Sequence, residues 1–317
     1  MSSKPFTFIP IPREPPSKWK ITPHIEFQHL TGKIDLEVEV SSEYLFVGSG
    51  SYEFNPRRRQ GEADVWHVFH RSKGTICIPG SSIKGAVRTL VEAISNSCVS
   101  TLKSKERKAV GKKHARCNPE EGKLCVGCNL FGAAGYKGRI SFSDAFPTGD
   151  VKLVKVKIGE LFTPKRFKGR KIYENRRFQP LDSQHPEANH RFVEAAPRNT
   201  KFKTTLHFEN VSEEELGIVF HALGWKTEGD KVNTAFSIKV GGAKPRCFGA
   251  VTIKPVKATT WNIKNLKPSL TTYTGKNLTQ FIKECLSKGK KLLHEDAYNK
   301  LLEALTPKSQ PCPTRGY

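Results

Sequence analysis

The sequence predicts an α+β fold, and three features carry that prediction. Residues 33–40 alternate polar and apolar side chains without a break, which is typical of a half-buried β-strand. In residues 83–94 the apolar side chains instead recur at spacings of three and four, as they do on one face of a helix. Alternation returns at 200–208 and in the segment 249–256, so strands and helices mix along one chain.

The elements of the first half follow from local signals. Residues 1–27 are expected to form an extended arm, because six prolines fall within the first 23 residues. Pro79 and Gly80 predict a tight turn into the helix, with Ser81 or Ser82 capping its first turn. A short strand is expected at 139–142.

The second half begins with a long basic excursion at 151–192, which we interpret as part β-hairpin and part loop. After the strand at 200–208, Ser212 and Glu215 fit the capping box of a short helix. Strands follow at 235–240 and 249–256, and two helices lie within 276–305. The last ten residues are expected to be disordered.

This order of elements is compatible with a ferredoxin-like α+β domain that carries long inserted loops.

The charge of the chain points to a polyanionic partner. Its 53 Lys and Arg against 30 Asp and Glu give a net charge of +23 over 317 residues. Clustered cations attract phosphates independently of sequence, and this excess is atypical of a metabolic enzyme. No apolar run is long enough for a transmembrane helix and no secretory signal begins the chain, so we expect a cytoplasmic protein without membrane partners.

Clustered cysteines predict a metal site. Eight cysteines are too few for a disulfide scaffold of this length. His114, Cys117, Cys125 and Cys128 have the spacing H-x2-C-x7-C-x2-C, which supplies four ligands for a closed, tetrahedral zinc site of structural type. His114 is the weakest member of this set, and Cys98 could take its place.

Two segments could meet phosphate. Residues 78–88 (IPGSSIKGAVR) bring unpaired N–H groups, hydroxyls and two cations to a helix start. Residues 241–249 (GGAKPRCFG) join flexible backbone to Lys244 and Arg246. The alternative interpretations are an ordinary helix start and an ordinary turn.

Together these motifs resemble a known family. PGSSIKGAVR after VGSG, CxxCNLFGAAGYKGRISFSDA, FVEAAPRNTKFKTTLHF and VGGAKPRCFGAV resemble, in the same order, the RAMP superfamily of CRISPR-associated proteins. More narrowly they resemble the backbone subunits of type III effector complexes. The resemblance covers about residues 28–256, which implies a RAMP core over this range, between the N-terminal arm (1–27) and a C-terminal helical extension (257–317).

The resemblance implies an RRM-like core with a zinc knuckle, a β-hairpin thumb at about 151–192, and assembly beside other RAMP subunits along a CRISPR guide RNA that pairs with single-stranded target RNA. The guide-RNA contacts would come from the two phosphate segments. They are Ser81, Ser82, Lys84, Arg88, Gly241, Gly242, Lys244 and Arg246.

The resemblance also implies a possible catalytic residue. In target-cleaving subunits an Asp before the PGSS turn supports cleavage with a divalent cation such as Mg²⁺, and Asp64 has a similar spacing here. Its surroundings, ADVWHVFH, differ from the family pattern. The alternatives are a stand-alone, metal-independent endoribonuclease that processes precursor RNA through His67 or His70, and a generic RNA chaperone.

Overall fold

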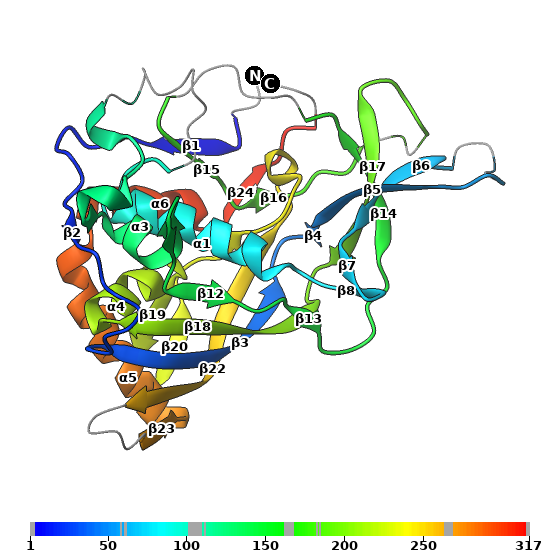
Figure 1. Cartoon of the computed structure of the whole chain (residues 1–317). Helices are drawn as coiled ribbons and strands as arrows, with labels where there is room; N and C mark the ends of the chain where they lie inside the picture. The colour runs from blue at the N-terminus through cyan, green and yellow to red at the C-terminus, as the bar shows by residue number, and fades with distance from the viewer. Residues whose placement is uncertain are drawn as a thin grey trace.

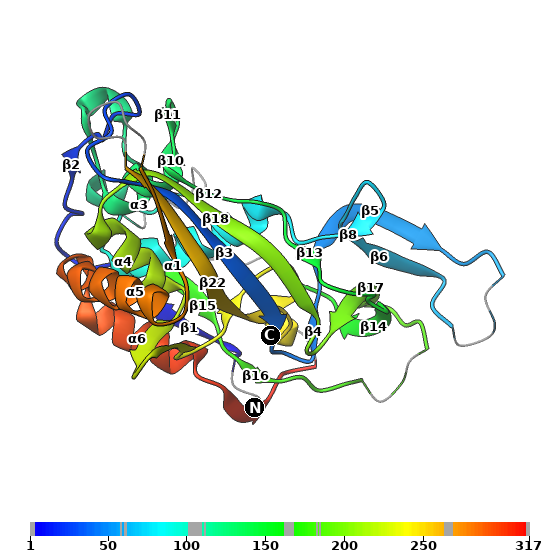
Figure 2. The same cartoon turned by 90° about the horizontal axis from the view of Figure 1, so that it is seen from below.

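A computed structural model describes residues 4–57, 59, 62–100, 110, 112–161, 168–181, 183, 185–262 and 269–314. Its main sheet has the strand order β12-β18-β3-β22-β21, with all neighbours antiparallel. Figure 2 shows the long strands β18, β3 and β22 side by side. Their bounds are β12 (Ile140–Phe142), β18 (Lys201–Val211), β3 (Leu30–Val40), β22 (Ala250–Asn262) and β21 (Ile238–Lys239), with β13 (Phe146–Pro147) and β23 (Ser269–Tyr273) at the margins.

The expected strand at 33–40 is confirmed within β3. Its apolar residues are buried, and the alternating charged residues are only partly covered. A period of two places the apolar set on one face of the sheet, which is the face that packs in the core.

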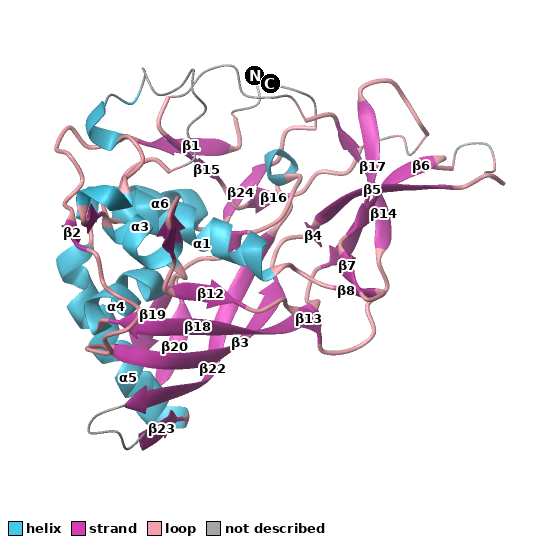
Figure 3. Cartoon of the chain, viewed as in Figure 1, coloured by secondary structure: helices cyan, strands magenta, loops and turns pink. Residues whose placement is uncertain are grey.

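Helices gather on one side of this sheet (Figures 1 and 3). They are α1 (Gly80–Ile94), α3 (Val126–Phe131), α4 (Glu213–Ala222), α5 (Gly275–Gly289) and α6 (Glu295–Leu305). The expected helix over 83–94 is confirmed as α1, whose stripe of apolar side chains is buried in the main core. The capping box of Ser212 and Glu215 is confirmed at the start of α4.

The start of α1 corrects one expectation. Ser81 and Ser82 lie inside the first turn and cap nothing, because the helix begins at Gly80. The Gly80 N–H donates instead to the Asp144 carboxylate, 2.8 Å away. The Asp144 carboxylate, which lies in the β12–β13 connection, thus caps the start of α1 in place of a serine hydroxyl.

A second sheet stands beside the first and has the order β14-β17-β6-β5. Its strands are β14 (Val154–Gly159), β17 (His190–Pro197), β6 (Val65–Phe69) and β5 (Gly48–Phe54), with β4 (Tyr44–Leu45) also paired to β17. The basic excursion thus contributes β14 and β17. Residues 48–69 complete the sheet, because β6 pairs in parallel with β17.

Short strand pairs tie the remaining segments to these sheets. The N-terminal residues contribute β1 (Phe6–Ile9), which pairs with β15 (Arg170–Tyr173), and β2 (Trp19–Lys20), which pairs with β9 (Lys123–Leu124). The other pairs are β7 (Arg71–Ser72) with β8 (Thr75–Ile76), β10 (Gly132–Ala133) with β11 (Tyr136–Lys137), β16 (Arg176–Arg177) with β24 (Lys308–Pro311), and β19 (Trp225–Glu228) with β20 (Lys231–Thr234).

The C-terminal tail corrects another expectation. Residues 308–314 are ordered, because β24 pairs with β16 and Cys312 forms a disulfide with Cys247. The sequence gives no sign of this bond, since both cysteines are isolated along the chain. The tail therefore returns to the glycine-rich segment between β21 and β22.

Candidate functional sites

A pocket of about 500 Å³ lies where α1, β15, β21 and the segment 241–244 meet. It brings together five of the eight expected guide-RNA contacts, from two motifs that are far apart in the sequence. Its lining includes Ser81, Ser82, Gly85, Ala86, Thr89 and Leu90 from α1, Lys171, Ile172 and Tyr173 from β15, and Phe46, Val47, Gly48, Lys239, Gly241, Gly242, Lys244 and Leu305. We call it the lysine pocket.

Glycine is required where the wall of this pocket turns. Gly241 has a φ of 78°, and a Cβ added there would lie 2.2 Å from the Phe46 carbonyl oxygen. The next residue, Gly242, donates its N–H to that same oxygen at 2.8 Å. The segment therefore packs against Phe46 more closely than any larger residue allows.

The lysine pocket is basic. Lys171, Lys239 and Lys244 line it, and no Asp or Glu occurs among its lining residues in the described part of the chain. Lys239 is buried, and its Nζ donates to the carbonyls of Cys247 and Phe248 at 3.1 and 3.2 Å. Burial lowers the pKa of Lys239 to about 7 and that of Lys244 to about 8. An anion is the natural ligand of such a site.

Two predicted contacts on α1 lie outside this lining. Arg88 forms an ion pair with Glu92 at 2.7 Å, and its Nη2 lies 3.8 Å from the Cys128 sulfur. Its guanidinium is therefore directed toward the cysteines described below. Lys84 is partly buried next to Arg88, and burial, followed by that neighbouring charge, lowers its pKa.

Arg246 is placed differently from the expectation of an open phosphate contact. It is only 4% exposed, and its guanidinium donates to the backbone carbonyls of Gly159, Glu160 and Pro313. Because these donors are directed at backbone oxygens, Arg246 joins the end of β14 to the C-terminal tail. We assign it a structural role.

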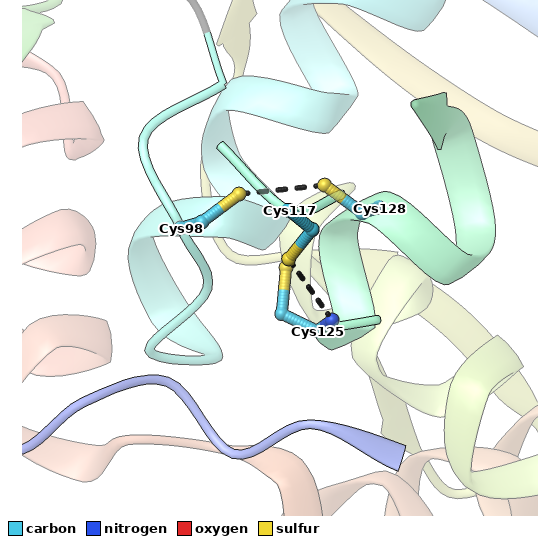
Figure 4. A group of neighbouring side chains, drawn as sticks. All are labelled: Cys98, Cys117, Cys125 and Cys128. Carbon is cyan, nitrogen blue, oxygen red and sulfur yellow. Dashed lines mark hydrogen bonds between the residues drawn. The ribbon is translucent and has the colours of Figure 1, made fainter. Parts of the chain in front are cut away.

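The cysteine cluster consists of Cys98, Cys117, Cys125 and Cys128 (Figure 4). All four are buried, and their sulfur atoms lie within 4.8 Å of one another. Hydrogen bonds from Cys117, then Cys128 and Cys98, hold the pKa of the Cys125 thiol well below its usual range. The group therefore readily provides a thiolate.

This donor set fits zinc. In a tetrahedral site with Zn–S bonds of about 2.3 Å, neighbouring sulfurs lie about 3.8 Å apart, which matches the crowding seen here. Four thiolates around Zn²⁺ carry excess negative charge, and two cations are at hand to offset it. Arg88 lies beside Cys128, and Arg170 donates to the carbonyls of Ser97 and Cys98. Closed sites of four protein ligands are structural.

His114 is a correction. It is buried, but it lies outside the group of four ligand atoms. Burial, followed by the charge of Arg170, lowers the pKa of its imidazole. Cys98 takes the fourth position because the chain turns back after α1 and is held there by Gly127, whose N–H donates to Ser97 Oγ at 2.9 Å.

Asp64 lies in a second, smaller cavity of about 240 Å³ on the second sheet. The lining includes Tyr52, Trp66, His67, His190 and Arg191. The rings of Tyr52 and His67 are 4.4 Å apart, and burial, followed by the charge of Arg191, lowers the pKa of His67. One Asp64 oxygen accepts the Val65 N–H at 3.0 Å, which orients the carboxylate at the start of β6. His70 is not part of this lining.

Sequence reasoning did not identify Phe46, Lys171, Tyr173 or Lys239 as site residues. Lys171 and Tyr173 belong to the excursion at 151–192. Its basic and aromatic composition indicated RNA contact but did not show which residues make it. The sequence around Lys239 contains no signal for a binding site, because a single lysine in a strand is ordinarily solvated.

Within the described residues, no helix is long and apolar enough to cross a membrane.

Comparisons with known proteins agree with the resemblance. The family model of the RAMP superfamily matches residues 37–252. The CRISPR system Cms endoribonuclease Csm3 of Streptococcus thermophilus is 27% identical over 199 residues, which cover 61% of this chain and 78% of the relative. The region matched by the family model contains α1, all four cysteines of the cluster and the glycine-rich segment between β21 and β22.

Proposed function

Since the chain belongs to the RAMP superfamily, we propose that it is a guide-RNA-binding subunit of a type III CRISPR ribonucleoprotein complex. It would work in the cytoplasm beside other RAMP subunits, holding a guide RNA that pairs with single-stranded target RNA. The similarity to an endoribonuclease of a CRISPR system supports the type of complex.

The lysine pocket is the observation that carries this proposal. Ser81 and Ser82 come from the start of α1, and Gly241, Gly242 and Lys244 come from a segment about 160 residues later, yet all five line one basic pocket. Helix N–H groups, hydroxyls, close backbone and lysines together suit a sugar-phosphate strand.

The strand order supports the proposed core. Along the chain β3, α1, β12, β18, α4 and β22 follow one another, and the sheet order β22-β3-β18-β12 is that of a ferredoxin-like domain. The second sheet is our candidate for the thumb, enlarged by β5 and β6 beyond the expected residues 151–192. The cysteine cluster would hold a structural zinc ion that fixes residues 98–128 to α1.

Affinity purification of the tagged protein from its host tests the proposal. We expect several RAMP proteins and short RNAs of discrete length to co-purify. In the purified complex, Lys244→Met should weaken RNA binding and flatten its dependence on the logarithm of salt concentration by about 0.7. Exposed Lys276, replaced in the same way, is the control. Recovery of the chain alone, without RNA, would contradict the assembly role.

We propose target cleavage as a second activity, and the cavity around Asp64 favours it. A carboxylate there lies beside aromatic rings that can stack on a displaced base and beside Arg191, which can face a phosphate. Of the two carboxylates in the described lining, Glu187 is paired with Lys157 at 3.1 Å, so Asp64 is the candidate ligand, and Mg²⁺ is commonly bound by one or two carboxylates. A bound Mg²⁺ would supply Lewis-acid chemistry, while Asp64 would fix its position.

Asp64→Asn in the assembled complex tests this activity. Cleavage of target RNA should fall by at least about 100-fold while guide and target binding persist. Glu53→Gln, an exposed acid on the neighbouring strand β5, should cleave normally. Equal cleavage by the two variants would remove Asp64 from the mechanism. The stand-alone processing activity predicts instead that the isolated chain cuts repeat RNA without metal and loses this activity on His67→Ala.

A further inference from the structure

The lysine pocket holds more buried positive charge than its surroundings balance. Lys239 is 7% exposed and its ammonium has three N–H donors, two of which are used on the carbonyls of Cys247 and Phe248. One donor is left for a ligand in the pocket. These carbonyls are neutral, so they orient the ammonium without offsetting its charge.

Among the lining residues that the structure describes, none is an acid that could serve as a counter-ion for Lys239. The segment after β21 presents Lys244, and β15 presents Lys171 and Tyr173. The lining residues of α1 and of residues 46–48 are uncharged, and the cross-strand partner of Lys239 on β22 is Ala250. Arg246 is directed away, at the carbonyls of Gly159, Glu160 and Pro313.

A buried ammonium that faces only like charge can lose its proton or bind an anion. The first outcome is the one we expect in the free protein, because burial and then the charge of Lys244 lower the pKa of Lys239 to about 7. Burial also lowers the pKa of Lys244 to about 8. Near neutral pH the amines of Lys239 and Lys244 are therefore not fully protonated in the free protein, and a bound phosphate would stabilise their protonated forms.

We propose, on the basis of the proposed function, that the protein takes up protons when RNA binds at the lysine pocket. A backbone phosphate enters between Lys239 and Lys244, and both amines are ammonium ions in the complex. Lys239 becomes an RNA-binding residue by this inference, and the pH of the solution becomes a determinant of affinity.

The sign of the effect follows from the order of the pKa values. Phosphate raises the pKa of both amines, so the complex holds more protons than the free protein once the pH exceeds the free value. Affinity is highest below about pH 7 and falls by up to about tenfold per pH unit above it. Above about pH 8, where both amines must gain a proton, the fall approaches about a hundredfold per unit.

Two measurements on the unmodified protein test this. Fluorescence anisotropy with a labelled single-stranded RNA gives affinity from about pH 6 to about pH 9.5 at fixed ionic strength. Calorimetry at about pH 8, in two buffers with different heats of protonation, counts the protons taken up. We expect between about one and two protons per RNA site.

Arginine variants show which lysine takes up each proton, because arginine keeps its charge throughout this pH range. In Lys239→Arg and in Lys244→Arg, the fall in RNA affinity per pH unit should be smaller than in the parent protein by a factor of up to about ten. Lys276→Arg on the surface of α5 should leave the profile unchanged.

The outcomes separate this inference from the proposed function. Tight RNA binding with a flat pH profile and no proton uptake would overturn the inference and leave RNA binding intact. Failure to bind RNA at any pH would contradict the proposed function, and the inference with it.

Discussion

At the scale of single residues, Gly241 fixes the shape of the lysine pocket. Its left-handed φ turns the chain after β21, and its missing Cβ lets the backbone approach the Phe46 carbonyl. A side chain there would collide with the Phe46 carbonyl and displace the wall that carries Gly242 and Lys244. The position therefore matters for stability and for the distance across the pocket.

Gly241→Ala should lower the free energy of unfolding by about 3 kcal/mol, because it combines an unfavourable φ with a clash against backbone. Gly74→Ala is the matched control: it has a φ of 83° and open space around it, so it should cost only about 1 kcal/mol. Urea unfolding of both variants measures the difference. Equal losses would mean that the contact with Phe46 carries no energy.

Residue types alone predicted part of the pocket and misplaced the rest. The glycines and Lys244 were identified because their segment could only serve as a turn or a phosphate contact. Arg246, two residues later, met the same criteria, yet it is directed at backbone oxygens of β14 and of the tail. Lys239 was missed because its function depends on burial, which comes from elements distant in sequence.

At the scale of elements, the cysteine cluster joins the end of α1 to the start of α3. The CxxC pair lies at the start of α3, and Cys98 follows the last turn of α1. Sequence spacing identified Cys117, Cys125 and Cys128, because local pairs have characteristic intervals. It could not rank Cys98 above His114, because that choice depends on where the chain turns after α1.

We expect the folded protein to bind one zinc ion and Cys98→Ser to lose most of it, together with about 3 kcal/mol or more of stability. His114→Gln should retain the metal. Metal analysis and thermal unfolding with and without a chelator provide the readouts. Zinc loss from the His114 variant, with retention by the Cys98 variant, would reverse our assignment of the fourth ligand.

At the scale of the whole molecule, the sequence predicted the mixed α+β fold, and the strands expected at 33–40, 139–142 and 200–208 lie in the main sheet. The second sheet was predicted only in part, because β6 and β17 pair in parallel across more than 120 residues and neither strand is strongly periodic. The disulfide between Cys247 and Cys312 likewise depends on the fold, since it links a loop of the core to the tail.

Reduction of this disulfide should destabilise the molecule. It closes a loop with a sequence separation of 65, for which the chain-entropy account gives a stabilisation of about 4 kcal/mol at most. Cys312→Ser should lower the unfolding midpoint under oxidising conditions and abolish the effect of a reductant. A midpoint in the parent protein that does not respond to a reductant would contradict a formed bond.

Photo-crosslinking of the RNA in the purified complex, with the crosslinked peptides identified by mass spectrometry, tests most directly whether RNA lies in the lysine pocket. We expect crosslinks in residues 80–89, which form about the first three turns of α1, and in residues 239–244, because both segments line the lysine pocket. Crosslinks confined to other surfaces, with these two segments unmodified, would contradict it.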